Sequence, residues 1–396
     1  MLFIFLFGFL VNLVGQSFDR VCILNPIGID IMQLNQQHKK TLGRTELSEE
    51  LDNLFHSANK ALKDSVFSVT FKNQVPPSGD MHDYMSFAPY WWPDSTKVDG
   101  LPYIRKDGEC NPEQNNVSDK RQLNMMAKKV LCLSVAYVVF GHSVFAEKAD
   151  QLLRVWFLDS ATRMNPNLNY GQAVQGRNVG KASGIIETRS FIGMLDAVEL
   201  LRKDSIFEQH TYPGIKQWFN EYLTWLDTAD LAIKERNARN NHGTWYTAQY
   251  ARYAYFVGKD SLAKDALVNI KERIADQIDR DGKQALELIR TKSLSYSLFN
   301  IEAYFNCFSI ADKVGLSLWY YETVDGRSVK KAFDFLMPYI QTENKWPYQQ
   351  IFAIPYKDYY CLLKTANLKY ANSNYEKYLA LDIFKQYDKH FSTIIY

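Results

Sequence analysis

The chain has 396 residues, more than one simple core usually organises, so a single domain of this length needs a closed or repeating architecture. Apolar residues account for 46% of the chain and aromatic residues for 14%, enough for a large core with rings left for stacking on sugars. A formal net charge of +2 excludes a general nucleic-acid binder, so a polyanionic partner must be held by a local cluster of arginine and lysine.

The first residues predict a signal peptide. Residues 1–15 form an apolar run that is shorter than the roughly 20 residues needed to span a bilayer. Gly15 and Ser17 supply small residues for cleavage, although the run lacks the usual preceding lysine or arginine. We predict a signal peptide over residues 1–17, cleaved between Gly15 and Phe18. The mature chain is then periplasmic or secreted and has no membrane attachment.

The five cysteines are not spaced for a metal or redox site. No pair stands as CxxC, and an odd number leaves at least one thiol outside any intrachain disulfide. The chain also has no HExxH or GxSxG motif. We expect neither a metal nor a cofactor.

Aromatic residues and prolines crowd the segment between residues 75 and 113. Pro89 and Pro93 exclude a regular helix interior there. A loop of this length in a compact domain is usually a lid or a binding loop. We expect Trp91 and Trp92 to point in different directions, with one anchoring the loop and the other facing a cleft.

Helices dominate the chain from Arg121 onwards, and their ends recur at a near-constant spacing. Glycines or short polar turns end helices near residues 141, 202, 258 and 315, roughly every 60 residues. That is the length of a two-helix hairpin with its loops, and hairpins repeated at this period stack into a solenoid or close into a toroid. We predict one all-α domain over residues 18–396, an (α/α)n toroid or incomplete barrel of repeated helical hairpins with a long aromatic lid loop.

A polar segment with four glycines separates two of these helices, between residues 165 and 184. It carries Gln172, Arg177 and Lys181, and the next helix opens before Arg189. One interpretation is a flexible connector. The other is that its backbone N–H groups and cations form an anionic subsite. The residues alone leave both interpretations open.

A change from polar to aromatic residues predicts a helix start at Asn240 and Asn241. Both are candidate N-caps, because a short amide accepts hydrogen bonds from the free N–H groups of a first turn. His242, Tyr246 and Gln249 then share one helix face, which is polar for a core face and suits catalysis. A structural histidine beside a capped helix is the alternative.

A second polar helix start brings Arg290, Lys292 and Tyr296. The two cations suit a carboxylate, which arginine binds through two hydrogen bonds. They are also expected to lower the pKa of the Tyr296 phenol below its usual value of about 10. The alternative is a capped helix start with a core tyrosine.

Asn241, His242, Arg290 and Tyr296 together offer an amide, an imidazole, a guanidinium and a phenol. No pair of Asp or Glu stands out beside them, which argues against a two-carboxylate glycosidase. The set fits β-elimination on a uronic-acid polymer, in which the C5 proton lies α to a carboxylate. The amide and the cation neutralise that carboxylate, and tyrosine or histidine protonates the O4 leaving group.

Five strings, in order along the chain, resemble the alginate lyase superfamily with an α/α-toroid fold. They are Tyr84–Asp94, Gly100–Gly108, Gly184–Arg189, Asn240–Tyr246 and Leu286–Arg290, of which APYWWPD and NNHGTWY are specific. The resemblance implies a polysaccharide lyase that cleaves alginate and leaves a 4,5-unsaturated uronate end.

The resemblance also implies roles for single residues. Asn241 and His242 would lie at the substrate carboxylate, Arg290 would support them, and Tyr296 would act as catalytic acid and, on one sugar, as base. Compared with bacterial members, Arg290 and Tyr296 are closer in sequence and lack a second arginine between them, which leaves the role of Arg290 open. The candidate substrate-binding residues are Tyr90, Trp91, Trp92, Gln172, Arg177, Lys181, Arg189, Tyr246, Gln249 and Lys292.

The stereochemistry of each sugar determines which of the two candidate residues, Tyr296 or His242, can act as the base. In mannuronate the C5 proton and O4 are syn, so Tyr296 can serve as both base and acid. In guluronate they are anti, and His242 is the candidate base. The alternatives to alginate are another polyuronate such as glucuronan, or a non-catalytic polyuronate-binding role. In each case the partner is an anionic polysaccharide, and we expect the chain to act as a monomer.

Overall fold

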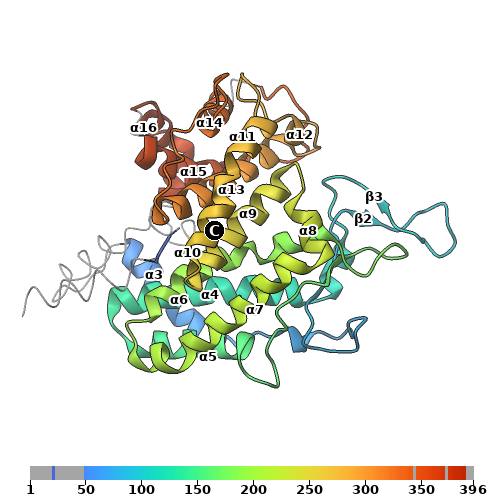
Figure 1. The fold of residues 1–396 in the computed structure, drawn as a ribbon, viewed down its shortest axis with the longest axis vertical. Helices are drawn as coiled ribbons and strands as arrows, with labels where there is room; N and C mark the ends of the chain where they lie inside the picture. Colours follow the sequence, from blue (N-terminus) through green and yellow to red (C-terminus); the bar gives the residue numbers. More distant parts are fainter. Residues whose placement is uncertain (1–19, 23–48, 342–344, 371–372, 389–396) are drawn as a thin grey trace, which may run out of the picture.

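The computed structural model describes residues 20–22, 49–341, 345–370 and 373–388. The predicted signal peptide lies outside these residues. The described part of the chain is mostly helical, as predicted, with four short strands at one end of the helical body (Figure 1).

The most buried helices pack side by side and form the inner wall of the fold. Glycines close three of them, because Gly141, Gly258 and Gly315 adopt the left-handed backbone that favours glycine after a helix. The helix ends predicted near residues 141, 202, 258 and 315 are therefore confirmed. These helices are α4 (Asp119–Phe140), α6 (Phe191–Leu201), α9 (Asn241–Phe256) and α13 (Ser293–Lys313), each packed against the next.

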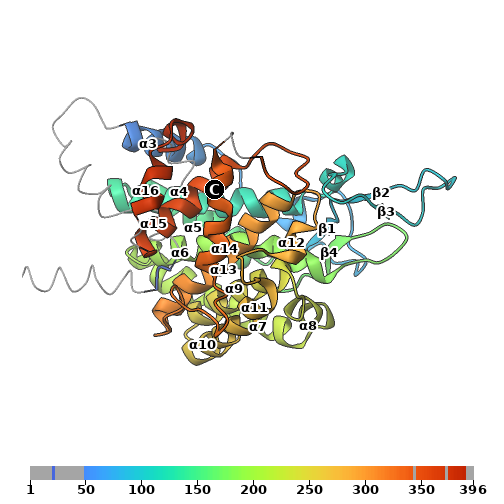
Figure 2. The ribbon, with the colours of Figure 1, turned by 90° about the horizontal axis from the view of Figure 1, so that it is seen from above.

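An outer helix follows each inner helix, so that the chain forms successive hairpins (Figures 1 and 2). The predicted (α/α)n toroid of helical hairpins is the observed architecture. The outer helices are α5 (Ser143–Phe157), α7 (Tyr212–Thr228), α10 (Asp260–Val268) and α14 (Val329–Leu336). Further helices are α3 (Glu49–Leu62), α8 (Asp230–Arg236), α11 (Ile270–Gln277), α12 (Ala285–Leu288), α15 (Tyr356–Tyr370), α16 (Ser373–Leu379) and α17 (Lys385–Asp388). The 3₁₀ segments are η1 (Val69–Phe71), η2 (Pro112–Asn116), η3 (Ala182–Ser190), η5 (Met337–Ile340) and η6 (Asp382–Phe384), and η4 (Phe207–Thr211) is a π-helical turn.

The inner helices α6 and α9 are buried on all sides rather than along one stripe. In α9 every residue is buried except His242. A helix that is buried all round belongs to the centre of a fold. The helix α4 has exposed residues, among them Arg121 and Lys128. It is the one helix of the described residues long and apolar enough to cross a membrane, but most of it is buried inside the protein.

The four strands form two small sheets that the sequence did not predict. The strand β1 (Met85–Phe87) pairs in parallel with β4 (Tyr170–Ala173), and β2 (Trp91–Trp92) pairs antiparallel with β3 (Ile104–Arg105). The aromatic segment is therefore partly a β-hairpin, which projects from the helices in both views (Figures 1 and 2).

Candidate functional site

The first turn of α9 is held by one cap and one carboxylate. Asn240 is the N-cap, and its side chain accepts a hydrogen bond from the backbone N–H of His242 at 3.3 Å. Asn241 is not a second cap, contrary to the prediction. Its backbone N–H and its Nδ2 each donate to Glu287 on α12, at 2.7 Å. Burial raises the pKa of Glu287, although the hydrogen bonds from Asn241 act in the opposite direction.

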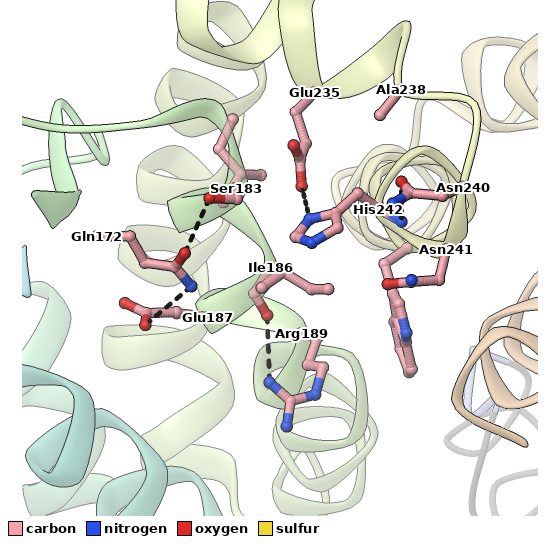
Figure 3. Close-up of polar contacts among 12 residues, drawn as sticks. Gln172, Ser183, Ile186, Glu187, Arg189, Glu235, Ala238, Asn240, Asn241 and His242 are labelled. Atoms are coloured by element: carbon pink, nitrogen blue, oxygen red, sulfur yellow. Dashed lines mark hydrogen bonds and ion pairs between the residues drawn. The ribbon is translucent and has the colours of Figure 1, made fainter. Parts of the chain in front are cut away.

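His242 faces a buried carboxylate. Its Nδ1 lies 2.6 Å from Oε1 of Glu235 on α8, a residue that is 3% exposed. The imidazole itself is 24% exposed, and Figure 3 shows it directly below Glu235, with Gln172 and Ser183 to the left of both. Because Glu235 occupies Nδ1, Nε2 is the ring atom left for a ligand.

Tyr296 lies in the first turn of α13 with an arginine on its ring. The Cζ of Arg290 is 3.7 Å from the ring centroid, and the phenol is 3.0 Å from the phenol of Tyr90. Burial, together with Tyr90, raises the pKa of Tyr296 above its ordinary value, and Arg290 only partly opposes this. The expected lowering by the nearby cations was therefore wrong, because loss of solvent outweighs one guanidinium that lies over the ring face.

Arg290 is already paired. Its Nε and Nη2 donate to Asp107 at distances of 2.7 to 3.2 Å, and Asp107 also accepts from the backbone and hydroxyl of Thr291. Burial opposes ionisation of Asp107, but the hydrogen bonds from Arg290 and Thr291 outweigh it and hold its pKa well below its usual range. The aromatic segment is thus fastened to the residues that precede α13.

Glu287 links the two halves of the site. It binds Asn241 directly, and it interacts electrostatically with both His242 and Arg290. The helices α9 and α13 pack against each other, and Tyr90 comes from the aromatic segment. The structure therefore brings the four predicted catalytic residues into one region, where they meet that segment.

The two tryptophans of β2 have different surroundings, as expected for neighbours on a strand. Trp92 anchors its loop, because its Nε1 donates to the carbonyl of Glu109 at 3.0 Å. Trp91 lies under two cations, with Arg177 Cζ and Lys181 Nζ each 5.1 Å from its ring. Burial lowers the pKa of Lys181.

The polar segment before η3 is ordered rather than a flexible connector. Gln172 in β4 is buried and has a φ of 54°, which is unusual for a residue other than glycine. Its Oε1 accepts from Ser183 at 2.8 Å, and its Nε2 donates to Glu187 at 3.3 Å (Figure 3). Arg189 donates to the carbonyl of Ile186 at 3.4 Å.

Tyr246 and Gln249 lie in the core, so their predicted contact with substrate is corrected. The phenol of Tyr246 donates to the carbonyl of Leu226 at 2.8 Å. The Oε1 of Gln249 accepts from Thr188 at 2.7 Å. The helix-face argument failed because α9 is buried on all sides. Lys292, in contrast, lies near the site, over the ring of Tyr90 at 5.4 Å.

Three carboxylates of the site were missed from the sequence: Asp107, Glu235 and Glu287. They do not form a catalytic pair of carboxylates but are the partners of an arginine, a histidine and an asparagine. The position of Glu235, seven residues before His242 across a short turn, was the available signal. Among the described residues, no three His, Cys, Asp or Glu side chains are grouped so that they could hold a metal ion.

Comparisons with known proteins show which proteins the chain is similar to. The family model described as alginate lyase matches residues 68–346. The structure is similar to that of an alginate lyase from Bacteroides ovatus, with 37% identity, a TM-score of 0.84, and coverage of 91% of this chain and 97% of that chain. A comparison with curated proteins gives no match.

Two more distant structures share the fold. Alginate lyase A1-III from Sphingomonas species A1 has 15% identity and a TM-score of 0.52, covering 89% of this chain and 90% of that chain. A variant of alginate lyase A1-III complexed with a tetrasaccharide has 16% identity and a TM-score of 0.55, covering 93% of this chain and 92% of that chain.

Proposed function

The chain belongs to the alginate lyase family and is a polysaccharide lyase, and we propose that it cleaves alginate by β-elimination at the site around His242. The observation that carries the proposal is the position of this residue. His242 is the one residue of α9 that is not buried, and it stands beside Asn241. Through Glu287 both are connected to the Arg290–Tyr296 pair.

The first task of the site is to neutralise the carboxylate of the sugar. Asn241 uses one N–H of its amide on Glu287, so the second N–H remains to donate to the sugar carboxylate. Its Oδ1 is buried without a partner among the described residues and, as an acceptor, takes no part in this contact. His242 adds Nε2 beside this amide. Arg290 contributes less charge than the sequence implied, because Asp107 already pairs with it.

The elimination then moves one proton off C5 and another onto O4. The C5–H electron pair forms the C4–C5 double bond while the C4–O4 bond breaks. Tyr296 has a raised pKa, so it is a protonated phenol at neutral pH and is suited to donate to O4. On guluronate, Nε2 of His242 takes the C5 proton from the opposite side while the Tyr296 phenol protonates O4. On mannuronate Tyr296 must first lose its proton, so that the phenolate takes the C5 proton and then returns it to O4.

The test is the ultraviolet absorbance of the 4,5-double bond, measured separately on mannuronate-rich alginate, guluronate-rich alginate and glucuronan. We expect a rise on alginate with the wild-type chain, and a loss of roughly 10²–10⁴-fold in rate for Tyr296→Phe. A rise on glucuronan alone would replace alginate with another polyuronate. Binding without any new double bond would leave a polysaccharide-binding role.

We further propose that the mature enzyme is exported and acts as a monomer. The support is the apolar run at residues 1–15, which has the length of a signal-peptide core. The mass of the secreted form, and its elution in gel filtration against the 46.0 kDa of the full chain, test both points.

A further inference from the structure

The hydrogen bond between His242 and Glu235 determines the role of each ring nitrogen of His242. An ionised carboxylate can only accept hydrogen bonds, so the nitrogen that faces it carries the proton. We infer that Glu235 is a positioning residue that fixes His242 as the Nδ1–H tautomer and presents Nε2 to the substrate. This inference rests on the proposed function, because it specifies how His242 takes part in that reaction.

The arrangement is built into the local fold. Glu235 lies near the end of α8, and α8 packs against α9. Between the two helices the chain turns at Asn240, which caps α9 and accepts from the backbone N–H of His242. The backbone of His242 is therefore held by Asn240 and its ring by Glu235, and the ring cannot flip without losing the hydrogen bond from Nδ1 to a buried acceptor.

The carboxylate also supplies charge. When Nε2 takes the C5 proton, the ring becomes an imidazolium, and the neighbouring Glu235 compensates the new positive charge. When the ring is already protonated, Nε2–H donates to the sugar carboxylate instead. In both states the reacting atom is Nε2, and Nδ1–H remains bonded to Glu235.

Other charged groups surround the imidazole, but they act at longer range. Glu287 from α12 interacts electrostatically with His242 and with Arg290. Lys181, which precedes η3, interacts electrostatically with Glu235. Arg273 from α11 lies against Gly243 and donates to the carbonyl of Ala238. Within the described part of the chain, Glu235 is the carboxylate that is hydrogen-bonded to the ring.

The test combines a direct view of the tautomer with a pH profile. Nitrogen-15 NMR of histidine-labelled full-length protein reports which ring nitrogen is protonated, with His242→Ala identifying the signal. We expect the Nδ1–H form in the wild type and a mixture in Glu235→Gln. For Glu235→Gln we also expect kcat/KM on guluronate-rich alginate to fall roughly 10–100-fold. Without the carboxylate charge the acidic limb of the pH profile moves to lower pH by roughly one unit.

Two further variants separate geometry from charge. Glu235→Asp keeps the charge and restores part of the activity, whereas Glu235→Ala removes both acceptor and charge and is the most impaired. Glu221→Gln, an exposed glutamate on α7, is the matched control and leaves kcat/KM unchanged. An Nε2–H tautomer in the wild type, or an unchanged pH profile and tautomer in Glu235→Gln, overturns the inference. An Nδ1–H tautomer in a wild-type chain that forms no double bond on any polyuronate would instead refute the proposed function.

Discussion

Glu287 holds Asn241 at two points, with Oε1 accepting from the backbone N–H and Oε2 accepting from Nδ2, each at 2.7 Å. The first N–H groups of a helix have no acceptor within the helix, so Glu287 supplies one for α9. The same carboxylate fixes the orientation of the Asn241 amide. Helix geometry and substrate binding thus depend on one buried group.

Replacing Glu287 by glutamine therefore costs both stability and activity. Gln has one acceptor oxygen where Asn241 needs two, so a buried donor is left unsatisfied and the free energy of unfolding falls by about 1–3 kcal/mol. We expect kcat/KM to fall at least tenfold, because the amide is no longer fixed. Chemical denaturation and the ultraviolet assay measure the two effects. Full activity in this variant would show that the orientation of Asn241 is not important for catalysis.

Much of this architecture could be predicted from the sequence, because its signals are local. A glycine ends a helix through its own backbone freedom, so the ends at Gly141, Gly258 and Gly315 were visible in the chain. Asn241 and His242 are likewise neighbours in the NNHGTWY string, so their proximity was visible in the sequence. In these cases the residue type and its neighbours carry the whole argument.

The missing parts depend on packing between distant segments. The burial of Tyr246 and Gln249 follows from neighbours on every side of α9, which a helical period cannot reveal. Asp107 meets Arg290 across 183 positions in the chain. The raised pKa of Tyr296 is likewise caused first by burial, which residue types alone do not give. Composition and spacing do not contain these relationships.

Replacing His242 by alanine is expected to affect the reactions on guluronate and on mannuronate differently. In His242→Ala we expect activity on guluronate-rich alginate to fall roughly 10²–10⁴-fold, because the anti reaction loses its base. Activity on mannuronate-rich alginate is retained in larger part. It should increase towards alkaline pH, since the remaining base, Tyr296, has a raised pKa. Initial rates on the two block types across a pH series give the comparison. Equal losses on both substrates would contradict a division of labour between the two bases.

The ion pair between Asp107 and Arg290 gives the aromatic segment a pH-dependent attachment. The folded-state pKa of Asp107 is lowered, so its stabilisation is present above the unfolded pKa of about 3.9 and is lost as the pH falls towards the folded pKa. We expect Asp107→Asn to destabilise the protein by about 1–3 kcal/mol at neutral pH. The difference from wild type should shrink below pH ~4.

Thermal unfolding of wild type and Asp107→Asn over this pH range tests the attachment. Asp265→Asn, at an exposed position on α10, controls for the general effect of removing a carboxylate. A constant difference between wild type and Asp107→Asn at all pH values would show that the charge of Asp107 is not what stabilises the contact.

Two tyrosine variants distinguish a structural role in the core from a role in the candidate site. Tyr246→Phe removes a buried hydrogen bond to Leu226, so we expect the free energy of unfolding to fall by about 1–2 kcal/mol while KM stays unchanged. Tyr90→Phe removes the phenol that meets Tyr296, so we expect kcat to change and stability to change little. Denaturation curves and kinetics on alginate separate the two patterns. A raised KM in Tyr246→Phe with unchanged stability would return Tyr246 to the substrate-binding set, against its burial on the inner helix.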